Sequence, residues 1–126
     1  MTQTSGRREP AIRMVMMPRD TNHLGSIFGG HILSLIDQAA GYEARRNASK
    51  KFVTKVMREV EFIAPVFVGD FVSFYTETTR VGNTSVTISV DVVALRGADC
   101  VTEEQVTTAE VVMVAVDEKG KPVAVK

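Results

Sequence analysis

The sequence predicts an α+β fold in which one long helix lies against a curved antiparallel β-sheet. Three observations support this prediction. Residues 27–46 form the one segment with a clear helical pattern of apolar side chains. Most of the chain after residue 52 is strand-like and rich in β-branched residues. A Gly82-Asn83 pair separates two of these runs, which is typical of a tight hairpin because glycine accepts the backbone angles that such turns require.

The helix is predicted from the spacing of its apolar residues. These residues recur every three or four positions, which places them on one stripe of a helix. They are Ile32, Leu33, Ile36, Ala39, Ala40 and Ala44. The run Arg45-Arg46-Asn47 ends the helix, because cations are favourable at a helix C-terminus and asparagine can stop a helix. So few side chains are polar that we expect the helix to be largely enclosed.

Five segments have the composition or the alternation of strands. In residues 84–95, valine, isoleucine and alanine alternate with threonine, serine and aspartate, which indicates a half-buried strand. The predicted strands are residues 11–17, 52–63 (one long strand or two joined by a bend), 71–81, 84–95 and 106–117. We expect loops at residues 18–26 and 97–105, and fraying over the last six residues.

One amphipathic helix cannot bury its own apolar stripe, and one sheet leaves two long edges exposed. A curved antiparallel sheet wrapped around the central helix buries both apolar faces, and this arrangement is the hotdog fold. Pairing edge to edge with a second copy of the chain would cover one exposed edge. The sequence therefore predicts at least a homodimer.

Length and charge limit the classes of protein to which the chain can belong. Its 126 residues predict one domain, residues 11–126, after a flexible tail over residues 1–10. Lys plus Arg and Asp plus Glu both number 15, which argues against bulk attraction to nucleic acid or acidic membranes. No apolar run has the length of a membrane helix. The single cysteine fits a reducing, cytoplasmic compartment.

The most unusual residues lie around the start of the helix, in the run MPRDTNHLGSIFGGHILSLIDQAAG (17–41). Gly29 and Gly30 would place unpaired N–H groups at a helix N-terminus, where a carbonyl oxygen can approach closely. Tight packing of the helix is the alternative role for this pair. Asp37 shares a helix face with apolar residues and Gly41, so its carboxylate would be partly desolvated, which suits a catalytic base. A surface or capping aspartate is the alternative.

This run resembles the signature of acyl-CoA thioesterases of the YciA and brain acyl-CoA hydrolase type. Three further segments match that family in order: PVFVGD (65–70), VGNTSV (81–86) and VAVDEKGKPVAV (114–125). The resemblance extends over residues 12–125. It implies a hotdog fold, dimers assembled into hexamers, and hydrolysis of an acyl-CoA to the free acid and CoA without a separate cofactor. Arg58, Glu59 and Glu61 depart from the small or apolar residues common in the family, which leaves the acyl-chain preference open.

The resemblance also implies roles for the residues around the helix N-terminus. Asp37 would activate water or attack the thioester itself, and the sequence does not separate these two mechanisms. From their place at the helix N-terminus, and independently of the resemblance, Gly29, Gly30 and His31 would polarise the carbonyl through backbone N–H groups. Asn22 would assist from the other subunit of a dimer, so the active site would lie at the dimer interface. An Asx turn is the alternative role of Asn22.

A second set of residues is predicted to bind the substrate. Phe28 beside the helix and Phe62 in the strand over residues 56–63 would meet the acyl chain, with His31 close to them. The predicted CoA contacts are Gly82, Thr84, Ser85, Arg80 and Lys121. A plain hairpin turn also explains the glycine, and a single exposed cation is most often a solvated charge.

Two other functions remain open from the sequence. A hotdog hydratase or dehydratase acting on acyl thioesters would need a histidine paired with an acid, and His31 is the candidate. A non-catalytic regulator would bind acyl-CoA without turnover. No spacing of histidine, cysteine or carboxylates indicates a metal site. Cys100 lies in a loop rich in acids, which does not favour a nucleophilic thiolate.

Overall fold

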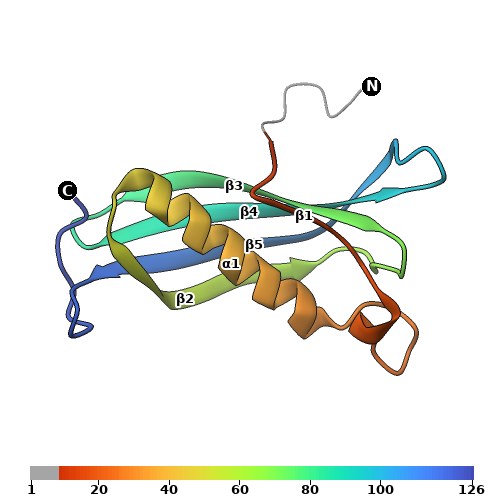
Figure 1. The fold of residues 1–126 in the computed structure, drawn as a ribbon, viewed down its shortest axis with the longest axis horizontal. Coiled ribbons are helices and arrows are strands. Elements are labelled where there is room, and N and C mark those ends of the chain that lie inside the picture. Colours follow the sequence, from red (N-terminus) through yellow and green to blue (C-terminus); the bar gives the residue numbers. More distant parts are fainter. Residues whose placement is uncertain (1–8) are drawn as a thin grey trace.

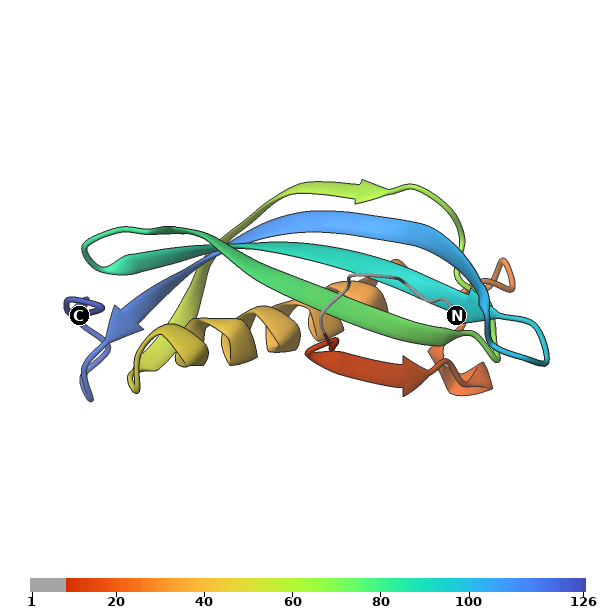
Figure 2. The ribbon, with the colours of Figure 1, turned by 90° about the horizontal axis from the view of Figure 1, so that it is seen from above.

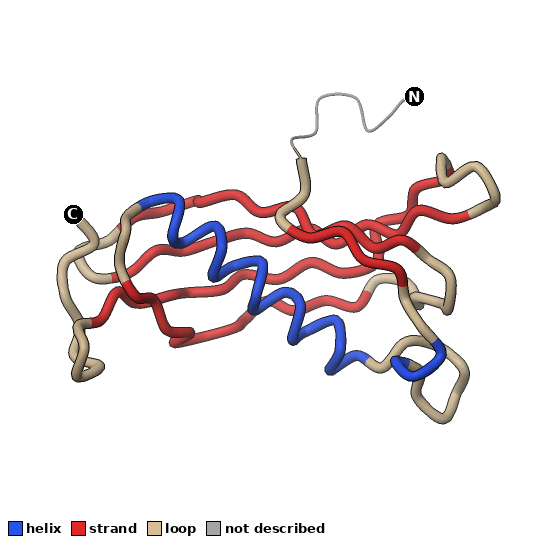
Figure 3. The backbone as a smooth tube through the Cα atoms, in the orientation of Figure 1, coloured by secondary structure: helices blue, strands red, loops and turns tan. Residues whose placement is uncertain are grey.

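The computed structural model describes residues 9–126, and residues 1–8 of the expected tail lie outside the described residues. Helix and strands follow one another in the predicted order (Figure 1). They are β1 (Ile12–Val15), a 3₁₀ helix (Pro18–Asp20), α1 (Gly29–Asn47), β2 (Lys51–Phe62), β3 (Phe71–Val81), β4 (Ser85–Arg96) and β5 (Thr102–Val116). The 3₁₀ helix occupies part of the segment predicted to be loop, just before α1 (Figure 3).

All five strands form one antiparallel sheet in the order β1-β3-β4-β5-β2. The sheet curves over α1, which crosses its concave face (Figure 2). This is the hotdog fold that the sequence predicts. The two edges differ, because β1 has 4 residues whereas β2 has 12. β2 therefore leaves a long edge without a neighbouring strand in the described part of the chain.

The core lies between α1 and the concave face of the sheet. The buried apolar residues of α1 are Ile32, Leu35, Ile36, Ala39, Ala40 and Ala44. They confirm the predicted stripe, except that Leu33 is only half-buried. On β4, the alternating side chains of Val86, Ile88, Val90 and Val92 are fully buried. Because each buried aliphatic side chain contributes about 1.5–3 kcal/mol, this contact fixes α1 on the sheet.

The expectation of a loop over residues 97–105 is wrong for its second half. β5 begins at Thr102, and its first residues pair with the end of β4 up to Arg96. The side chains of residues 102–105 are all exposed, so the alternation that reveals a strand in a sequence is missing there. The backbone ladder with β4 extends the strand instead.

The last six residues do not fray as expected. The Val123 N–H donates to the Ala115 carbonyl, and the Val125 N–H donates to the Asn83 carbonyl, each at 2.9 Å. The side chain of Val125 is buried in the core. Backbone hydrogen bonds and one buried side chain therefore fix the C-terminus against β5 and the β3–β4 turn.

A charged residue, Glu43, is buried on the face of α1 that packs against β3. Its carboxylate accepts hydrogen bonds from the Thr76 hydroxyl at 3.0 Å and the Thr78 hydroxyl at 2.8 Å. Arg46, one turn further along α1, lies 3.2 Å from the same carboxylate. A buried carboxylate is tolerated when it is hydrogen-bonded and paired. These contacts fix the rotation of α1 about its own axis.

We expect Glu43→Ala to lower the free energy of unfolding by about 1–3 kcal/mol, because it removes the hydrogen bonds that two threonine hydroxyls of β3 donate to this carboxylate. Urea denaturation at a fixed protein concentration measures the change. Glu43→Gln keeps one acceptor oxygen, so its free energy of unfolding should lie between those of wild type and Glu43→Ala. Glu77→Ala, on an exposed position of β3, is the control. Equal effects of Glu43→Ala and Glu77→Ala would contradict a structural role for the buried carboxylate.

Candidate active site

The loop before α1 is closed by its own backbone hydrogen bonds. Thr21 and Ile27 form an isolated antiparallel bridge, and the Phe28 N–H donates to the Asp20 carbonyl at 2.8 Å. The Ile27 N–H reaches across to the Val66 carbonyl at 2.7 Å. The loop is thereby attached to the β2–β3 connector, which sets the direction in which α1 begins.

The first turn of α1 supplies unpaired backbone donors. α1 begins at Gly29, two residues later than the sequence predicts. Among the described residues, the N–H groups of Gly29 and Gly30 have no acceptor. The ring of Phe28 explains the second glycine, since a Cβ at Gly30 would lie 2.5 Å from its Cε2 atom. At Gly29, a Cβ would meet the ring of Phe62 at 3.4 Å. These donors and both predicted phenylalanines thus lie together.

Asn22 is held inside the loop by its own side chain. Its amide oxygen accepts the N–H groups of Leu24 at 2.8 Å and Ser26 at 3.3 Å. Its amide nitrogen donates to the Ser26 hydroxyl at 3.3 Å. This is the Asx turn that the sequence left open as the alternative role. An amide nitrogen has two donors, so the same side chain keeps one further N–H in the described part of the chain.

Asp37 lies half-buried on α1 and accepts a hydrogen bond from Thr54 of β2, whose hydroxyl is 2.5 Å from Oδ1. Thr54 also contacts the sulfur of Met113 on β5 at 3.4 Å. Gly41, one turn further along α1, leaves open space, because a Cβ there would meet only Met113 at 3.8 Å. Thr54 was not predicted from the sequence, since a threonine in a strand is ordinary.

An apolar cavity of about 320 Å³ adjoins the first turn of α1. Its walls come from the loop and start of α1, from the end of β2 with the connector behind it, and from β5. The lining residues are Ser26, Ile27, Gly29, Ile32, Phe62, Ile63, Ala64, Pro65, Val66 and Thr107. Because Gly29 belongs to both the cavity wall and the first turn, a ligand in this cavity would lie beside the unpaired donors.

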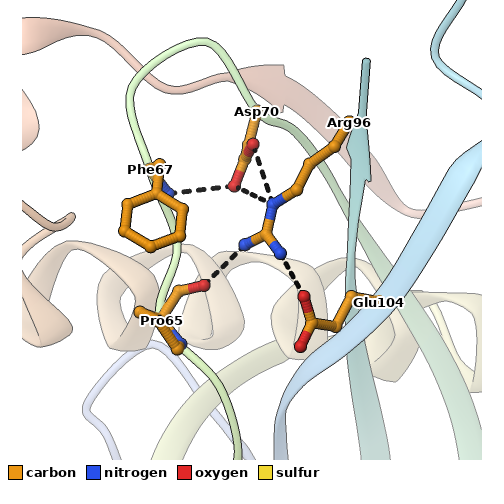
Figure 4. A network of polar contacts seen from close by, with 5 residues as sticks. All are labelled: Pro65, Phe67, Asp70, Arg96 and Glu104. Carbon is orange, nitrogen blue, oxygen red and sulfur yellow. Dashed lines mark hydrogen bonds and ion pairs between the residues drawn. The ribbon is translucent and has the colours of Figure 1, made fainter.

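Arg96 fixes one wall of this cavity (Figure 4). Its guanidinium donates to the Pro65 carbonyl at 2.6 Å and to both carboxylate oxygens of Asp70 at 3.0–3.1 Å, and it pairs with Glu104. The Asp70 carboxylate in turn accepts the Phe67 N–H at 2.9 Å. One side chain at the end of β4 therefore holds the whole β2–β3 connector.

The structure separates the predicted catalytic groups within one chain. Gly29 and Asp37 are eight residues apart on α1, which is about 12 Å along the helix axis. A carbonyl that is bound at the first turn cannot also contact Asp37 of the same helix. Asn22, in contrast, lies in the loop that leads directly into the first turn.

His31, in the first turn of α1, approaches Asp20 at the end of the 3₁₀ helix. Its Nε2 atom lies 3.6 Å from Oδ2 of Asp20, beyond the range of a hydrogen bond. Nε2 is buried and has no hydrogen-bond partner among the described residues. Asp20 Oδ2 already accepts the Met17 N–H at 2.9 Å. The histidine–acid pair that a hydratase would need is therefore close but not hydrogen-bonded.

The predicted CoA contacts lie at the opposite end of α1, around the β3–β4 hairpin and the C-terminal turn (Figure 1). The hairpin closes through the Gly82 N–H and the Ser85 carbonyl at 2.7 Å. The Thr84 carbonyl accepts the Ala115 N–H at 2.9 Å. Arg80 and Lys121 are exposed. One chain therefore does not bring these residues to the cavity.

Two negative findings apply to residues 9–126. In this range, no group of three or more histidine, cysteine, aspartate or glutamate side chains is placed to hold a metal ion. No helix within it is long and apolar enough to cross a membrane.

A comparison with known protein families matches more than half of the chain. Residues 24–101 match the model of the thioesterase superfamily, a stretch that contains the first turn of α1, Asp37 and the cavity wall of the connector. The chain belongs to the thioesterase superfamily. Its resemblance to the YciA type is confirmed by a 35% identity over 113 residues to the acyl-CoA thioester hydrolase YciA of Escherichia coli, covering 88% of this chain and 86% of that one.

Two further similar proteins extend the comparison. An uncharacterised acyl-CoA thioester hydrolase of Zymomonas mobilis is 46% identical over 83 residues, which cover 66% of this chain and 56% of that protein. Among solved structures, a hexameric hotdog-fold thioesterase of Campylobacter jejuni superposes with a TM-score of 0.89 at 42% identity, covering 94% of this chain and 91% of that one.

We expect Arg96→Lys to lower the free energy of unfolding by about 1–3 kcal/mol, because a lysine cannot reach Pro65, Asp70 and Glu104 at once. Urea denaturation measures the loss. Arg45→Lys, on an exposed position of α1, is the matched control and should change stability by less than about 0.5 kcal/mol. Indistinguishable denaturation curves for the two variants would show that the connector does not depend on Arg96.

Proposed function

We propose that this chain hydrolyses acyl-CoA thioesters to a free carboxylic acid and CoA. The observation that carries the proposal is the pair of unpaired N–H groups at Gly29 and Gly30 beside an apolar cavity. Donors fixed at a helix N-terminus stabilise the negative charge that develops on a thioester oxygen during attack. The cavity gives the apolar acyl chain a place next to them. The names of the YciA relatives support the same reaction.

Asp37 is the group that we assign to the attack on the carbonyl carbon, either as a base for water or as the nucleophile. The Thr54 hydroxyl donates to Oδ1 of Asp37 and leaves Oδ2 for the reaction. Because about 12 Å of helix separates Asp37 from Gly29, the Asp37 that acts at one cavity comes from a second chain. Asn22, in the loop before the first turn, would supply its remaining amide N–H to the water or to the carbonyl.

The long edge of β2 is the surface that we propose for the dimer. Unpaired backbone groups along an edge strand favour pairing with another strand. β2 also carries exposed apolar side chains, among them Val53 and Phe62. A two-fold axis beside β2 would run the two α1 helices antiparallel and place Asp37 of one chain near the first turn of the other. The hexameric thioesterase of Campylobacter jejuni supports three such dimers.

The same two-fold arrangement gives the predicted CoA contacts a role. It brings the β3–β4 hairpin of one chain toward the first turn of α1 in its partner. Gly82, Thr84 and Ser85 would then contact pantetheine, and Arg80 and Lys121 would meet the phosphates of CoA.

Cys100, the single cysteine, is compatible with a cytoplasmic location.

We expect wild-type protein to release free thiol from acyl-CoAs, and Asp37→Asn to reduce kcat by about 100-fold or more, since the amide cannot take up a proton or attack. A panel from short to long chains plus one aromatic acyl group is assayed with a thiol reagent. Size-exclusion chromatography must show the same assembly for both proteins. Unchanged kcat in Asp37→Asn would remove Asp37 from the reaction, and no thiol release by wild type from any substrate would contradict the proposed function.

Mixing two inactive variants tests whether the active site combines two chains. Asn22→Ala and Asp37→Asn each lack one group in every site. If the groups come from different chains, co-refolded dimers of the two variants contain one intact site in every mixed dimer. Random mixing makes half of the dimers mixed, and each mixed dimer has one intact site out of two. About a quarter of wild-type activity should therefore be restored. Activity no higher than that of the separate variants would show that each site lies within one chain.

Thr54→Val tests the positioning of Asp37. Valine keeps the shape of threonine but cannot donate to Oδ1, so the carboxylate loses its fixed orientation. We expect kcat to fall by about 10-fold with little change in KM, because such an orienting contact acts on the attack and not on binding. Thr54→Ser restores the donor and should recover most of the rate. Equal rates in the valine and serine variants would argue against an orienting hydrogen bond.

A hydratase acting on acyl thioesters is the second candidate, because His31 of the first turn of α1 lies 3.6 Å from Asp20. The two reactions differ in their products. A hydratase would remove the absorbance of an enoyl thioester without releasing free thiol, and His31→Gln would abolish that change. Thiol release that survives in His31→Gln would favour the hydrolase.

A further inference from the structure

The apolar cavity contains one buried hydroxyl group that has no partner. Thr107 lies on β5, where its side chain shares the concave face of the sheet with Ala109 and Val111. Its relative exposure is 1%. Among the described residues, no group donates to or accepts from its Oγ1 atom. This is the opposite of the usual pattern, in which the large majority of buried polar side chains are hydrogen-bonded.

The side chains that pair with Thr107 across the sheet do not supply the missing hydrogen bond. Its cross-strand partners are Phe62 on β2 and Val92 on β4, and neither carries a polar side chain. On the cavity wall, Ile27 and Ile32 are aliphatic, and the Ser26 hydroxyl accepts a hydrogen bond from the Asn22 amide at 3.3 Å. Phe62 and Thr107 both line the cavity, as does Gly29 of the first turn of α1. An occupant of this space would therefore meet the α1 donors and the Thr107 hydroxyl at the same time.

We propose that Thr107 makes the cavity selective for acyl groups that carry a hydrogen-bonding oxygen, such as hydroxyacyl or oxoacyl chains. This inference rests on the proposed function and specifies its substrate class. The thioester oxygen is bound at the first turn of α1, so the partner of Thr107 is a second oxygen further along the acyl chain. An alkyl chain of equal length leaves the hydroxyl buried and unpaired. An oxygen-bearing chain completes the hydrogen bond and is bound more tightly.

Paired substrates of equal length test this selectivity. We compare hexanoyl-CoA with its hydroxyhexanoyl and oxohexanoyl counterparts, with the oxygen at each position along the chain. For wild type we expect kcat/KM for the best oxygen-bearing chain to exceed that for hexanoyl-CoA by about 10-fold, a common size for one satisfied buried hydrogen bond. Thr107→Val, which replaces the hydroxyl with a methyl group, should bring this ratio to about one. The matched control is Thr108→Val, the next residue of β5, which lies on the other face of the sheet and should keep the wild-type ratio.

Two further measurements keep the inference separate from the hydrolase proposal. Dissociation constants of the same CoA thioesters, measured by calorimetry on Asp37→Asn protein with and without Thr107→Val, give the selectivity without turnover. The melting temperature of ligand-free protein should rise in Thr107→Val, because valine removes an unpaired buried hydroxyl. Absence of thiol release from any substrate would overturn the hydrolase proposal alone. An unchanged selectivity ratio in Thr107→Val would show that no acyl oxygen binds the hydroxyl, and a lower melting temperature would show that the hydroxyl already has a partner. Either result would overturn the inference.

Discussion

The candidate site depends on how firmly α1 is packed against the concave face of the sheet. The apolar stripe of the helix meets the buried alternating residues of β4, and the Glu43 carboxylate fixes its rotation through two threonines of β3. A helix packed along its length holds its first turn in place, so the donors at Gly29 and Gly30 stay beside the cavity. Donors stabilise a developing charge best when they need no rearrangement during the reaction. On the opposite wall of the cavity, Arg96 holds the β2–β3 connector in place.

Much of the fold could be predicted because its elements have strong local patterns. The helix, the Gly82-Asn83 hairpin and the alternation in β4 are each visible within about a dozen residues. The prediction failed where structure comes from distant parts of the chain. The first residues of β5 pair with β4 although they are exposed and polar. Val125 is fixed by a carbonyl at Asn83 and by burial, neither of which a local pattern reveals.

The same distinction applies to the candidate site. Asp37 and the double glycine are chemically unusual at their positions, so the sequence singles them out. Thr54 and Arg96 are ordinary residues for a strand. Their roles appear only through contacts with distant residues: Thr54 contacts Asp37, 17 positions away, and Arg96 contacts Pro65, 31 positions away. For Asn22, the sequence left two roles open, an Asx turn and a part in the reaction. The structure places its side chain in an Asx turn, and this local role is compatible with a second one, since one amide N–H is left over.

The incomplete site within one chain and the exposed edge of β2 have a common physical origin in the hotdog fold. A sheet that covers one helix leaves its last strand without a neighbour, and the helix length puts the donors and Asp37 about 12 Å apart. A second chain at β2 would cover Val53 and Phe62 and bring the two groups together. It would also exclude water from Asp37, which is only half-buried in one chain, and electrostatic interactions strengthen as water is removed. In such an enzyme, the association that completes the fold also completes the chemistry.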